Sequence, residues 1–493
     1  MQKLNKLLSA IITEDIIADA TTSNPVVTSI TADSRKVIPG SMFIAVRGPL
    51  NDGHAYIPQA IKAGATVIVA EELPVTGHTG VTYVKVADSS VALGFLASEW
   101  HDNPSRKLKL IGVTGTNGKT TTATLLYQMA RLDGLKAGLL STVENRIEDI
   151  VEPAVNTTPS PLEINRLLSQ MVDAGCSFAA MEVSSHGMTQ HRTMGLHFSG
   201  GVFTNLTRDH LDYHGTFKAY LDAKKSFFDM LPSTAFALTN ADDRNGFIML
   251  QNSRARHLTY GLSGNPDFRG RVISDDFTGM ELSLNGIDIN TPFIGQFNAY
   301  NLTAVFGTWV ALGNDPEKTA VLLSRLQPVA GRFQTFRSQD GTTAIIDYAH
   351  TPDALENVLK TINDVVKGNT PVYTVFGAGG DRDHGKRPQM GRIAAMLSDV
   401  AIVTADNPRN EDPEAIAAQV LEGAMNCPDR RANVINIPDR AEAISRTIID
   451  APAGAVILIA GKGHETYQEF ENHRRIHFDD REHALDALNK RAN

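Results

Sequence analysis

A chain of 493 residues exceeds the size at which one hydrophobic core keeps growing, so we expect roughly two to four domains. Hydrophobic residues make up 42% and charged residues 20% of the chain, which is ordinary for a globular protein and excludes a disordered or fibrous one. The chain has 46 basic and 55 acidic residues, a net charge of -9, which argues against nucleic acid or an anionic membrane as the main partner.

The cysteine content and the N-terminal segment favour a cytoplasmic protein. Cys176 and Cys427 form no C-x-x-C pair, so neither a disulfide framework nor a cysteine-based zinc site is predicted. Charged residues interrupt the apolar residues of segment 1–20, which predicts a short amphipathic helix rather than a signal peptide. No segment approaches the roughly 18 apolar residues of a membrane span. We therefore expect a soluble protein.

Short apolar runs alternate with helical patterns, which predicts an α/β fold with parallel sheets covered by helices. The predicted strands are residues 108–113, 178–183, 202–205, 344–347, 372–376, 401–404 and 456–460. Between about 267 and 292 the segments are short and alternate in polarity, which predicts a small antiparallel sheet. Polar stretches near 104 and 330 mark the expected domain boundaries.

The sequence TGTNGKTT at residues 114–121 lies between a predicted strand and a predicted helix. Gly115 and Gly118 allow backbone N–H groups to turn toward an anion at the helix N-terminus. Lys119 supplies a positive charge for phosphate, and Thr120 can reach Mg2+. The first glycine of the common P-loop pattern is missing, and the alternative is a glycine turn with a surface lysine. The context favours a loop that holds a nucleoside triphosphate.

Several polar residues remain ambiguous when each is considered alone. Glu182 lies in an apolar predicted strand, where a carboxylate needs a cation or a donor unless it faces solvent at the strand end. His210 is typical of a loop histidine, and Lys224 is typical of a solvated helix lysine, with Lys225 as its rival. The Ser-Ser-His sequence at 184–186 lacks the G-x-S-x-G elbow of a hydrolase.

The motifs of the chain, taken together and in order, resemble those of the Mur ligase family. They are TGTNGKT at 114–120, MEVSSHG at 181–187, TNLTRDHLD at 204–212, GQFN at 295–298 with Asn301, GR at 331–332 and DYAHTP at 347–352. The resemblance implies three α/β domains. These would be a UDP-binding domain at 1–104, a central ATP-binding parallel sheet with the small antiparallel sheet at 105–330, and a Rossmann-like amino-acid-binding domain at 331–493.

The resemblance also implies that the chain binds ATP and Mg2+. The implied ATP contacts are Gly115, Thr116, Asn117, Gly118, Lys119, Thr120, Thr121, Asn301, Arg332 and Asp347. The implied catalytic residues are Lys119, Glu182, His210 and Lys224. Thr120, Glu182 and His210 would bind Mg2+. Lys224, which the Y-x-x-A-K spacing selects over Lys225, would carry a CO2-derived carbamate that holds a second Mg2+. Many relatives have an acid at position 334, where this chain has Gln334.

The same resemblance assigns the two other substrates. The ADSR sequence at 32–35 resembles the uridine-nucleotide domain of the family. The resemblance implies two sets of contacts to UDP-N-acetylmuramoyl-L-alanyl-D-glutamate. Those to its UDP part are Ala32, Ser34, Pro49, Leu50 and Asn51, and those to its muramoyl-dipeptide end are Asn156, Thr157, Thr158, Ser184, Gln190 and Arg192. The DNPR sequence at 406–409 resembles that of family members that add diaminopimelate, and Arg409 can grip a carboxylate that lysine lacks. The implied pocket is Arg382, Asp406, Asn407, Pro408, Arg409, Gly461 and Glu465.

We therefore expect a monomeric, cytoplasmic ligase that uses ATP to add meso-2,6-diaminopimelate to the D-glutamate of the UDP-muramoyl dipeptide through an acyl phosphate, in peptidoglycan precursor synthesis. One alternative is the same reaction with L-lysine. A second is folate polyglutamylation, which would lack the UDP domain. A third is a P-loop ATPase or nucleotide switch. The GAGG sequence at 377–380 is weak as a dinucleotide motif, and NAD is not expected.

Overall fold

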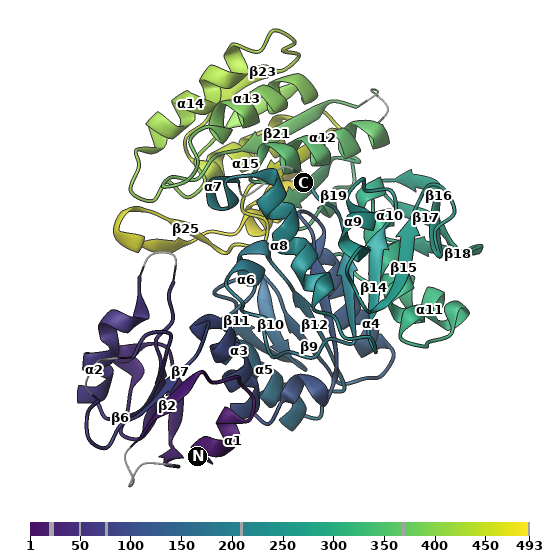
Figure 1. The fold of residues 1–493 in the computed structure, drawn as a ribbon. Coiled ribbons are helices and arrows are strands. Elements are labelled where there is room, and N and C mark those ends of the chain that lie inside the picture. Colours follow the sequence, from purple (N-terminus) through teal and green to yellow (C-terminus); the bar gives the residue numbers. More distant parts are fainter. Residues whose placement is uncertain are drawn as a thin grey trace. The chain divides into compact units, whose positions relative to one another are not determined.

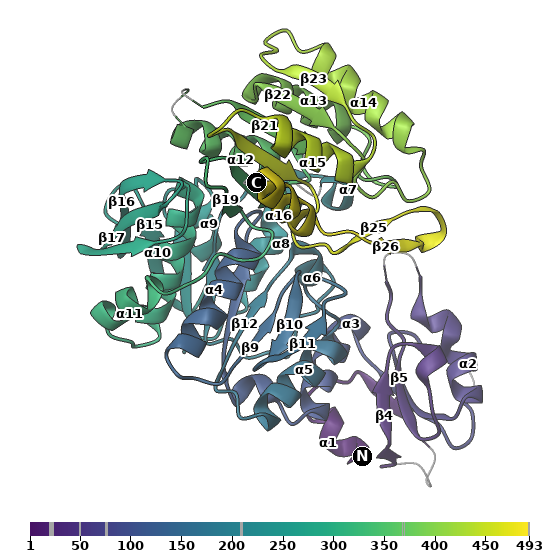
Figure 2. The ribbon, with the colours of Figure 1, turned by 180° about the vertical axis from the view of Figure 1, so that it is seen from behind.

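The computed structural model describes residues 1–18, 24–48, 51–73, 77–207, 211–366, 368 and 370–491, with only the backbone described at 211 and 212. The chain forms two compact units. Unit 1 comprises Met1–Leu206, Thr216–Tyr260 and Gly307–Leu312, and unit 2 comprises Thr207–Gly215, Gly261–Phe306 and Gly313–Asn493. Figures 1 and 2 show the elements from opposite sides.

Unit 1 begins with a small sheet in the strand order β2-β7-β6-β5-β4. The strands are β2 (Asp15–Ile17), β4 (Ser29–Thr31), β5 (Ser41–Ile44), β6 (Ala65–Ala70) and β7 (Thr82–Lys85). All neighbours pair in parallel except β2 with β7. Alternate residues enter two cores: Met42 packs in the cluster of α1 (Leu4–Leu8) and α3 (Ser89–Trp100), and Phe43 packs in that of α2 (Ile57–Lys62).

The predicted helix in segment 1–20 is wrong for most of its length. Strand β1 (Gln2–Lys3), which pairs with β3 (Val26–Val27), precedes the five-residue helix α1, and β2 follows it. The β-branched Ile16 and Ile17 fit strand pairing better than a helix, and they pair with β7.

The second part of unit 1 is built on a mostly parallel sheet, as predicted. Its strands follow the order β11-β10-β9-β12-β8-β13-β14-β15, and only the edge pairs of β10 are antiparallel. They are β8 (Lys109–Thr114), β9 (Ala137–Leu140), β10 (Glu144–Ile147), β11 (Ile150–Pro153), β12 (Phe178–Glu182), β13 (Gly200–Phe203), β14 (Phe236–Asn240) and β15 (Arg256–Gly261). The helices are α4 (Lys119–Leu132), α5 (Pro161–Asp173), α6 (Ser185–Thr189), α8 (Phe217–Asp229) and α9 (Gly246–Leu250).

Unit 2 contains the small antiparallel sheet that the alternating segments predicted. Strands β16 (Phe268–Asp276), β17 (Gly279–Leu284) and β18 (Ile287–Thr291) pair antiparallel. The other elements of this region are α7 (Leu211–His214), α10 (Gln296–Ala311), whose last turn belongs to unit 1, and α11 (Pro316–Leu323).

The largest sheet of unit 2 has the order β19-β20-β24-β21-β22-β23 and is parallel except for β19. Its strands are β19 (Gln334–Arg337), β20 (Thr343–Asp347), β21 (Val372–Phe376), β22 (Val400–Val403), β23 (Asn433–Asn436) and β24 (Val456–Ala460). One core includes α12 (Pro352–Val366), α13 (Lys386–Leu397) and α14 (Pro413–Met425), and a second includes α15 (Arg440–Asp450) and α16 (Asp480–Arg491). A hairpin of β25 (Tyr467–Glu469) and β26 (Arg475–His477) follows β24.

No helix in the described ranges is both long enough and apolar enough to cross a membrane.

A buried ion pair supports the strand ends of the unit 2 sheet. Arg440 donates to both carboxylate oxygens of Asp480 at 2.7 Å, and both side chains are 0% exposed. Arg440 Nη2 also donates to the carbonyl of Ala460 at 3.0 Å, and Nη1 approaches that of Ala405 at 3.5 Å. One guanidinium therefore ties the end of β24 to the segment that follows β22.

We expect Arg440→Met to lower the free energy of unfolding by about 3–5 kcal/mol, because it leaves the Asp480 carboxylate buried without its partner. Arg446→Met on the same helix is the matched control, since it removes only an exposed pair with Glu442 and should cost about 0.5 kcal/mol or less. Chemical denaturation monitored by circular dichroism measures both. Equal losses in the two variants would contradict the expectation.

Candidate functional site

The glycine loop after β8 has a conformation that its glycines make possible. Gly115 has φ 149° and Gly118 has φ 85°, and Gly118 is the N-cap of α4. A Cβ at Gly115 would lie 1.9 Å from Thr204 Oγ1, so the loop and the end of β13 approach too closely for any other residue. Lys119 Nζ donates to the carbonyls of Gly115 and Thr116 at 3.0 and 2.7 Å. Its charge is thereby held at the N-terminus of a helix, where anions are favoured.

The segment after β13 fixes the shape of this loop. Asn205 accepts from the amide of Thr116 at 2.8 Å through its carbonyl and from that of Asn117 at 2.9 Å through its side chain. Thr204 Oγ1 and Asn205 Nδ2 donate to the Asn117 carbonyl at 2.6 and 3.1 Å. The sequence prediction quoted this motif but gave Thr204 and Asn205 no role. Their position directly after a buried strand was the available signal.

Lys224 contacts the glycine loop, whereas the neighbouring Lys225 pairs with a residue of its own helix. Lys224 on α8 is 1% exposed, and its Nζ donates to the Gly115 carbonyl at 2.7 Å. The same ammonium lies 4.6 Å from the centroid of the Tyr220 ring, whose hydroxyl is 3.0 Å from Thr116 Oγ1. Lys225 forms an ion pair with Asp229 at 2.7 Å instead. Lys224 is thus not a solvated helix lysine.

Glu182, the last residue of β12, is buried and only half satisfied. It is 1% exposed, which excludes the solvent-facing alternative. Its Oε1 accepts from the amide of Thr142 at 2.7 Å, whereas Oε2 is buried without a hydrogen-bond partner among the described residues. A carboxylate oxygen buried in this way is costly unless a cation meets it. Glu182 therefore fits a cation ligand.

The other predicted metal ligands are less fully described. His210 lies outside the described residues. Thr120 is buried in the first turn of α4. In the described ranges no group of three or more His, Cys, Asp or Glu side chains is placed to hold a metal ion. That observation does not extend to Thr120 or Lys224, whose side chains are of other types.

A second polar group forms around Thr158 in unit 1. Thr158 Oγ1 donates to the Glu182 carbonyl at 2.9 Å and lies 3.0 Å from Ser184 Oγ. Arg192 is half-buried, and it donates to the Thr158 carbonyl at 2.6 Å and to Gln190 Oε1 at 2.7 Å. These residues include most of the predicted muramoyl-dipeptide contacts. Thr157 joins the group through Thr142, with their hydroxyls 3.0 Å apart, and Asn156 is exposed.

The predicted uridine contacts lie in the first sheet of unit 1. Ala32 follows β4, and Ser34 Oγ donates to Gln59 at 3.3 Å. Pro49 and Leu50 lie outside the described residues, but Asn51 accepts from the amide of Gly48 at 2.9 Å.

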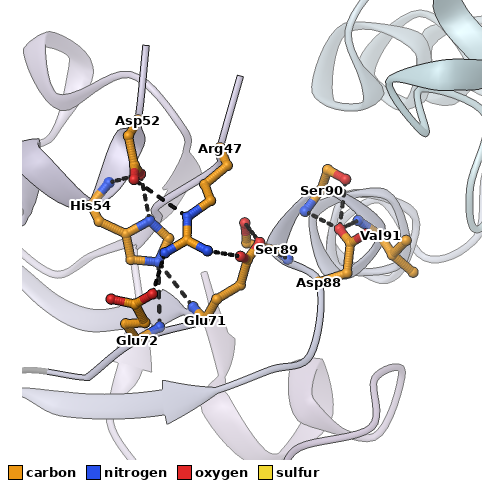
Figure 3. Close-up of polar contacts among 9 residues, drawn as sticks. All are labelled: Arg47, Asp52, His54, Glu71, Glu72, Asp88, Ser89, Ser90 and Val91. Atoms are coloured by element: carbon orange, nitrogen blue, oxygen red, sulfur yellow. Dashed lines mark hydrogen bonds and ion pairs between the residues drawn. The ribbon is translucent and has the colours of Figure 1, made fainter. Parts of the chain in front are cut away.

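A cluster of charged and polar side chains includes Arg47 and Asp52, the residues on either side of segment 48–51 (Figure 3). Arg47 contacts Asp52 at 3.3 Å, Glu71 at 3.1 Å and Glu72 at 2.5 Å. His54 Nδ1 is 2.7 Å from Asp52 Oδ1, while its Nε2 accepts from the Glu71 amide at 3.0 Å. Arg47 and Asp52, which flank segment 48–51, are thereby connected to each other and, with His54, to the two glutamates that directly follow β6.

In unit 2 the turn at 406–409 meets the segment that follows β24. Asn407 Nδ2 donates to Glu465 Oε2 at 2.9 Å. Gly461 has φ 118°, and a Cβ there would lie 3.4 Å from Asp406 Oδ2. Arg409, also at positive φ, is half-buried, and its Nη1 donates to the Gly380 carbonyl at 2.7 Å. The structure thus brings together most of the predicted amino-acid pocket.

Two of the glycines in segment 377–380 allow close packing against the segment that follows β22. A Cβ at Gly377 would lie 2.3 Å from the Thr404 carbonyl oxygen, and one at Gly380 would lie 1.9 Å from that of Pro408. Arg382, the remaining predicted pocket residue, is exposed and bonds to the Asp381 carbonyl at 3.1 Å.

The buried Arg387 connects Glu411, which follows the turn at 406–409, to the glycine segment at 377–380. It donates to both carboxylate oxygens of Glu411 at 2.9 and 2.8 Å, and to the Gly379 carbonyl at 3.2 Å. These hydrogen bonds lower the pKa of Glu411 to about 2, so the carboxylate stays ionised at neutral pH.

The three outer ATP contacts that were predicted, Asn301, Arg332 and Asp347, belong to unit 2, whereas the loop residues belong to unit 1. Asp347 accepts from the amides of Phe333 at 2.7 Å and Ala349 at 2.8 Å, and burial raises its pKa. The Arg332 guanidinium lies 4.7 Å from the Tyr348 ring centroid. Asn301 donates to the neighbouring Asn298 side chain at 3.3 Å.

Several residues of these groups were not foreseen from the sequence: Thr142, Asn205, Tyr220, Tyr348 and Lys462. Lys462 is 0% exposed and contacts Asp406, Asn407 and Glu465. Its position between two glycines after a buried strand was the only signal.

A mostly parallel sheet in which a strand leads through a glycine loop to a helix N-terminus defines a P-loop-type nucleotide-binding protein. Three family models match the chain: the Mur ligase middle domain at residues 113–309, the Mur ligase glutamate ligase domain at 331–463, and the Mur ligase family catalytic domain at 26–101. The chain belongs to the Mur ligase family.

The chain is also similar to individual proteins over nearly its whole length. It is 52% identical to a protein of Phocaeicola vulgatus over 99% of both chains, and 53% identical to one of Parabacteroides distasonis over 92% of this chain and 93% of that one. Both are named UDP-N-acetylmuramoyl-L-alanyl-D-glutamate–2,6-diaminopimelate ligase. A solved structure of a ligase with that name matches with a TM-score of 0.68 and 32% identity, covering 95% of this chain and 96% of the other.

We expect Gly115→Ala to raise the Kd for ATP by about 10-fold or more, because the added Cβ must displace Thr204 and with it the loop. Gly134→Ala is the control: Gly134 also has positive φ, at 81°, but no described atom lies within 4 Å of its Cβ position. It should cost about 1 kcal/mol of stability and leave the Kd unchanged. Isothermal titration calorimetry measures the Kd, and equal weakening in both variants would contradict the role of the close approach.

Proposed function

We propose that this chain is an ATP-dependent ligase that adds meso-2,6-diaminopimelate to the D-glutamate of UDP-N-acetylmuramoyl-L-alanyl-D-glutamate, a step of peptidoglycan precursor synthesis. The observation that carries the proposal is the turn at 406–409, which contains Asp406, Asn407 and Arg409 and is joined to Glu465 by the hydrogen bond from Asn407. The similarity to ligases named for this reaction, over nearly the full length of the chain, supports it.

The reaction requires two steps because a carboxylate is a poor electrophile. The γ-phosphoryl group of ATP first passes to the D-glutamate carboxylate, which breaks the bond to ADP and forms an acyl phosphate. The neutral amine of diaminopimelate then attacks the acyl carbon, phosphate leaves, and the amine loses a proton. The side chains supply binding and charge rather than a nucleophile. Lys119, held at the glycine loop, offsets negative charge on the phosphate oxygens.

Mg2+ fits the donors around this loop. Thr120, Glu182 and His210 would hold it, and the buried, unpartnered Oε2 of Glu182 supports that assignment. When bound, Mg2+ would act as a Lewis acid on phosphoryl oxygens and neutralise charge. Lys224 would carry a CO2-derived carbamate as a ligand of a second Mg2+. Its burial and its hydrogen bond to the Gly115 carbonyl support this role, and the ion pair of Lys225 with Asp229 argues against the neighbouring lysine.

Arg409 would distinguish diaminopimelate from lysine. Its guanidinium can bind the distal carboxylate of diaminopimelate, which lysine lacks. A cation prepared for that carboxylate would stay unpaired with lysine, at a cost of about 3 kcal/mol. This argues against the ligase that adds L-lysine. The presence of the first sheet, which carries the predicted uridine contacts, argues against folate polyglutamylation.

The proposed reaction also bears on the location of the protein. We infer a cytoplasmic location because the reaction consumes ATP, and both cysteines are free and buried. We also propose that the protein is a monomer.

The substrate assignment is tested by the wild type and Arg409→Ala with diaminopimelate and with lysine. The wild type should release ADP only when the UDP-muramoyl dipeptide and an amino acid are both present, and kcat/KM should favour diaminopimelate by about 100-fold. Arg409→Ala should lose most of this preference. A wild type that prefers lysine would refute the assignment, and ADP release indifferent to both substrates would favour a nucleotide switch.

We expect Lys224→Ala to lose most ligase activity and to regain part of it when short carboxylic acids are added, because they can replace the carbamate. Lys225→Ala is the matched control: it removes the ion pair with Asp229 and should not respond to the acids. ADP release with and without added acetate measures both. Full activity of Lys224→Ala without additives would rule out the carbamate role.

A further inference from the structure

Lys462 is a fully buried cation in the amino-acid pocket of unit 2. Its side chain is 0% exposed, and its Nζ donates to Asn407 Oδ1 at 3.0 Å and to Glu465 Oε2 at 3.2 Å. The same ammonium lies 3.6 Å from Asp406 Oδ1. Lysine is almost never buried unless its charge is matched. Its three neighbours are predicted pocket residues, so its charge acts directly on the site.

Lys462 also fixes the orientation of the Asn407 amide. Asn407 Oδ1 accepts from Lys462 Nζ and from the amide of Glu469, the latter at 2.9 Å. The amide nitrogen is thereby directed at Glu465 Oε2, 2.9 Å away. A flipped amide would lose all three hydrogen bonds, because its nitrogen would then face two donors. The pocket therefore has a fixed pattern of donors and acceptors.

The inner charged groups of the pocket have a net negative charge, which one bound cation would neutralise. The inner charges are those of Lys462 and the two carboxylates that contact it, Asp406 and Glu465, and their sum is -1. This sum leaves out Arg409, the cation assigned to the carboxylate of the substrate. Asp406 Oδ1 is buried without a hydrogen-bond partner among the described residues. It can therefore accept one ammonium group of a substrate. Arg409 is half-buried at the same turn and is suited to the carboxylate of the same amino-acid end.

We propose that Lys462 is a positioning residue that determines which amino acid the pocket prefers. It sets the inner charge of the pocket to -1. With this charge, the pocket favours an amino-acid end that bears both an ammonium and a carboxylate over one that bears an ammonium alone. The inference rests on the proposed function and deepens it. Without Lys462 the two carboxylates would repel the carboxylate of diaminopimelate and leave a lysine-like cation comparatively favoured. A merely structural lysine would instead affect both amino acids equally.

The test compares Lys462→Met, Lys462→Gln and Lys462→Arg with the wild type. Steady-state kinetics give kcat/KM for diaminopimelate, and lysine is measured both as substrate and as competitive inhibitor. Lys462→Met and Lys462→Gln should lower kcat/KM for diaminopimelate by about 100-fold. Their preference for diaminopimelate over lysine should fall by about 10-fold or more, with the KM for ATP unchanged. Lys462→Arg, which keeps the charge, should retain most of the preference.

Lys360→Met is the matched control, since among the described residues this exposed lysine pairs only with Glu356 in its own helix, and both kinetic constants should stay at wild-type values. Equal losses for both amino acids in the uncharged variants, with the preference intact, would overturn the inference. If Lys462→Met does not fold, Lys462→Gln and Lys462→Arg decide the question. A wild type that does not use diaminopimelate would refute the proposed function itself, whereas a selective wild type with an unchanged preference in the variants would refute the role of Lys462 alone.

Discussion

Parallel strand pairing is the constraint on which both polar sites depend. In unit 1 the register aligns Glu182 with Val113, and Phe203 with Thr114, so three neighbouring strands end level with one another. The residues that follow them must then share one edge of the sheet, which is where ligands gather in such folds. The contact between Gly115 and Thr204 is a direct result. In unit 2 the same arrangement brings the segments after β22 and β24 together.

The sequence predicted those strands well because they are fully buried. The predicted segments 372–376 and 456–460 coincide with β21 and β24. Strand β24 is an uninterrupted apolar run, and β21 is apolar except for the buried Thr374, as is typical of parallel strands. The N-terminal helix was overestimated for the opposite reason. Residues 9–17 are mostly exposed or half-buried, so no core pattern opposed a helical interpretation, and pairing with β7 decided the outcome.

Single residues left most of the site ambiguous, and the family resemblance supplied the site residues, including the choice of Lys224 over Lys225. The folded helix adds a physical reason for that choice, because Lys225 forms an ion pair with Asp229. Lys462 was missed because its role depends on residues about 55 positions away, such as Asn407. At position 334 the structure shows only that Gln334 Oε1 accepts from the Gly331 amide at 3.2 Å, a hydrogen bond that a carboxylate oxygen could also accept.

The buried charged side chains of this protein are of two kinds, those that stabilise the fold and those that are available to a ligand. Arg440 and Asp480 satisfy each other with two hydrogen bonds of 2.7 Å, which stabilises the strand ends and leaves nothing for a ligand. Among the described residues, the buried carboxylate oxygens without a hydrogen-bond partner are those of Glu182 and Asp406. Each costs about 1–3 kcal/mol in isolation, a cost that a bound cation would remove. Both carboxylates lie at or just beyond the carboxyl end of a parallel strand, so incomplete hydrogen bonding of buried carboxylates marks both sites. Asp406 differs from Glu182 in that its Oδ1 also lies 3.6 Å from the Lys462 ammonium.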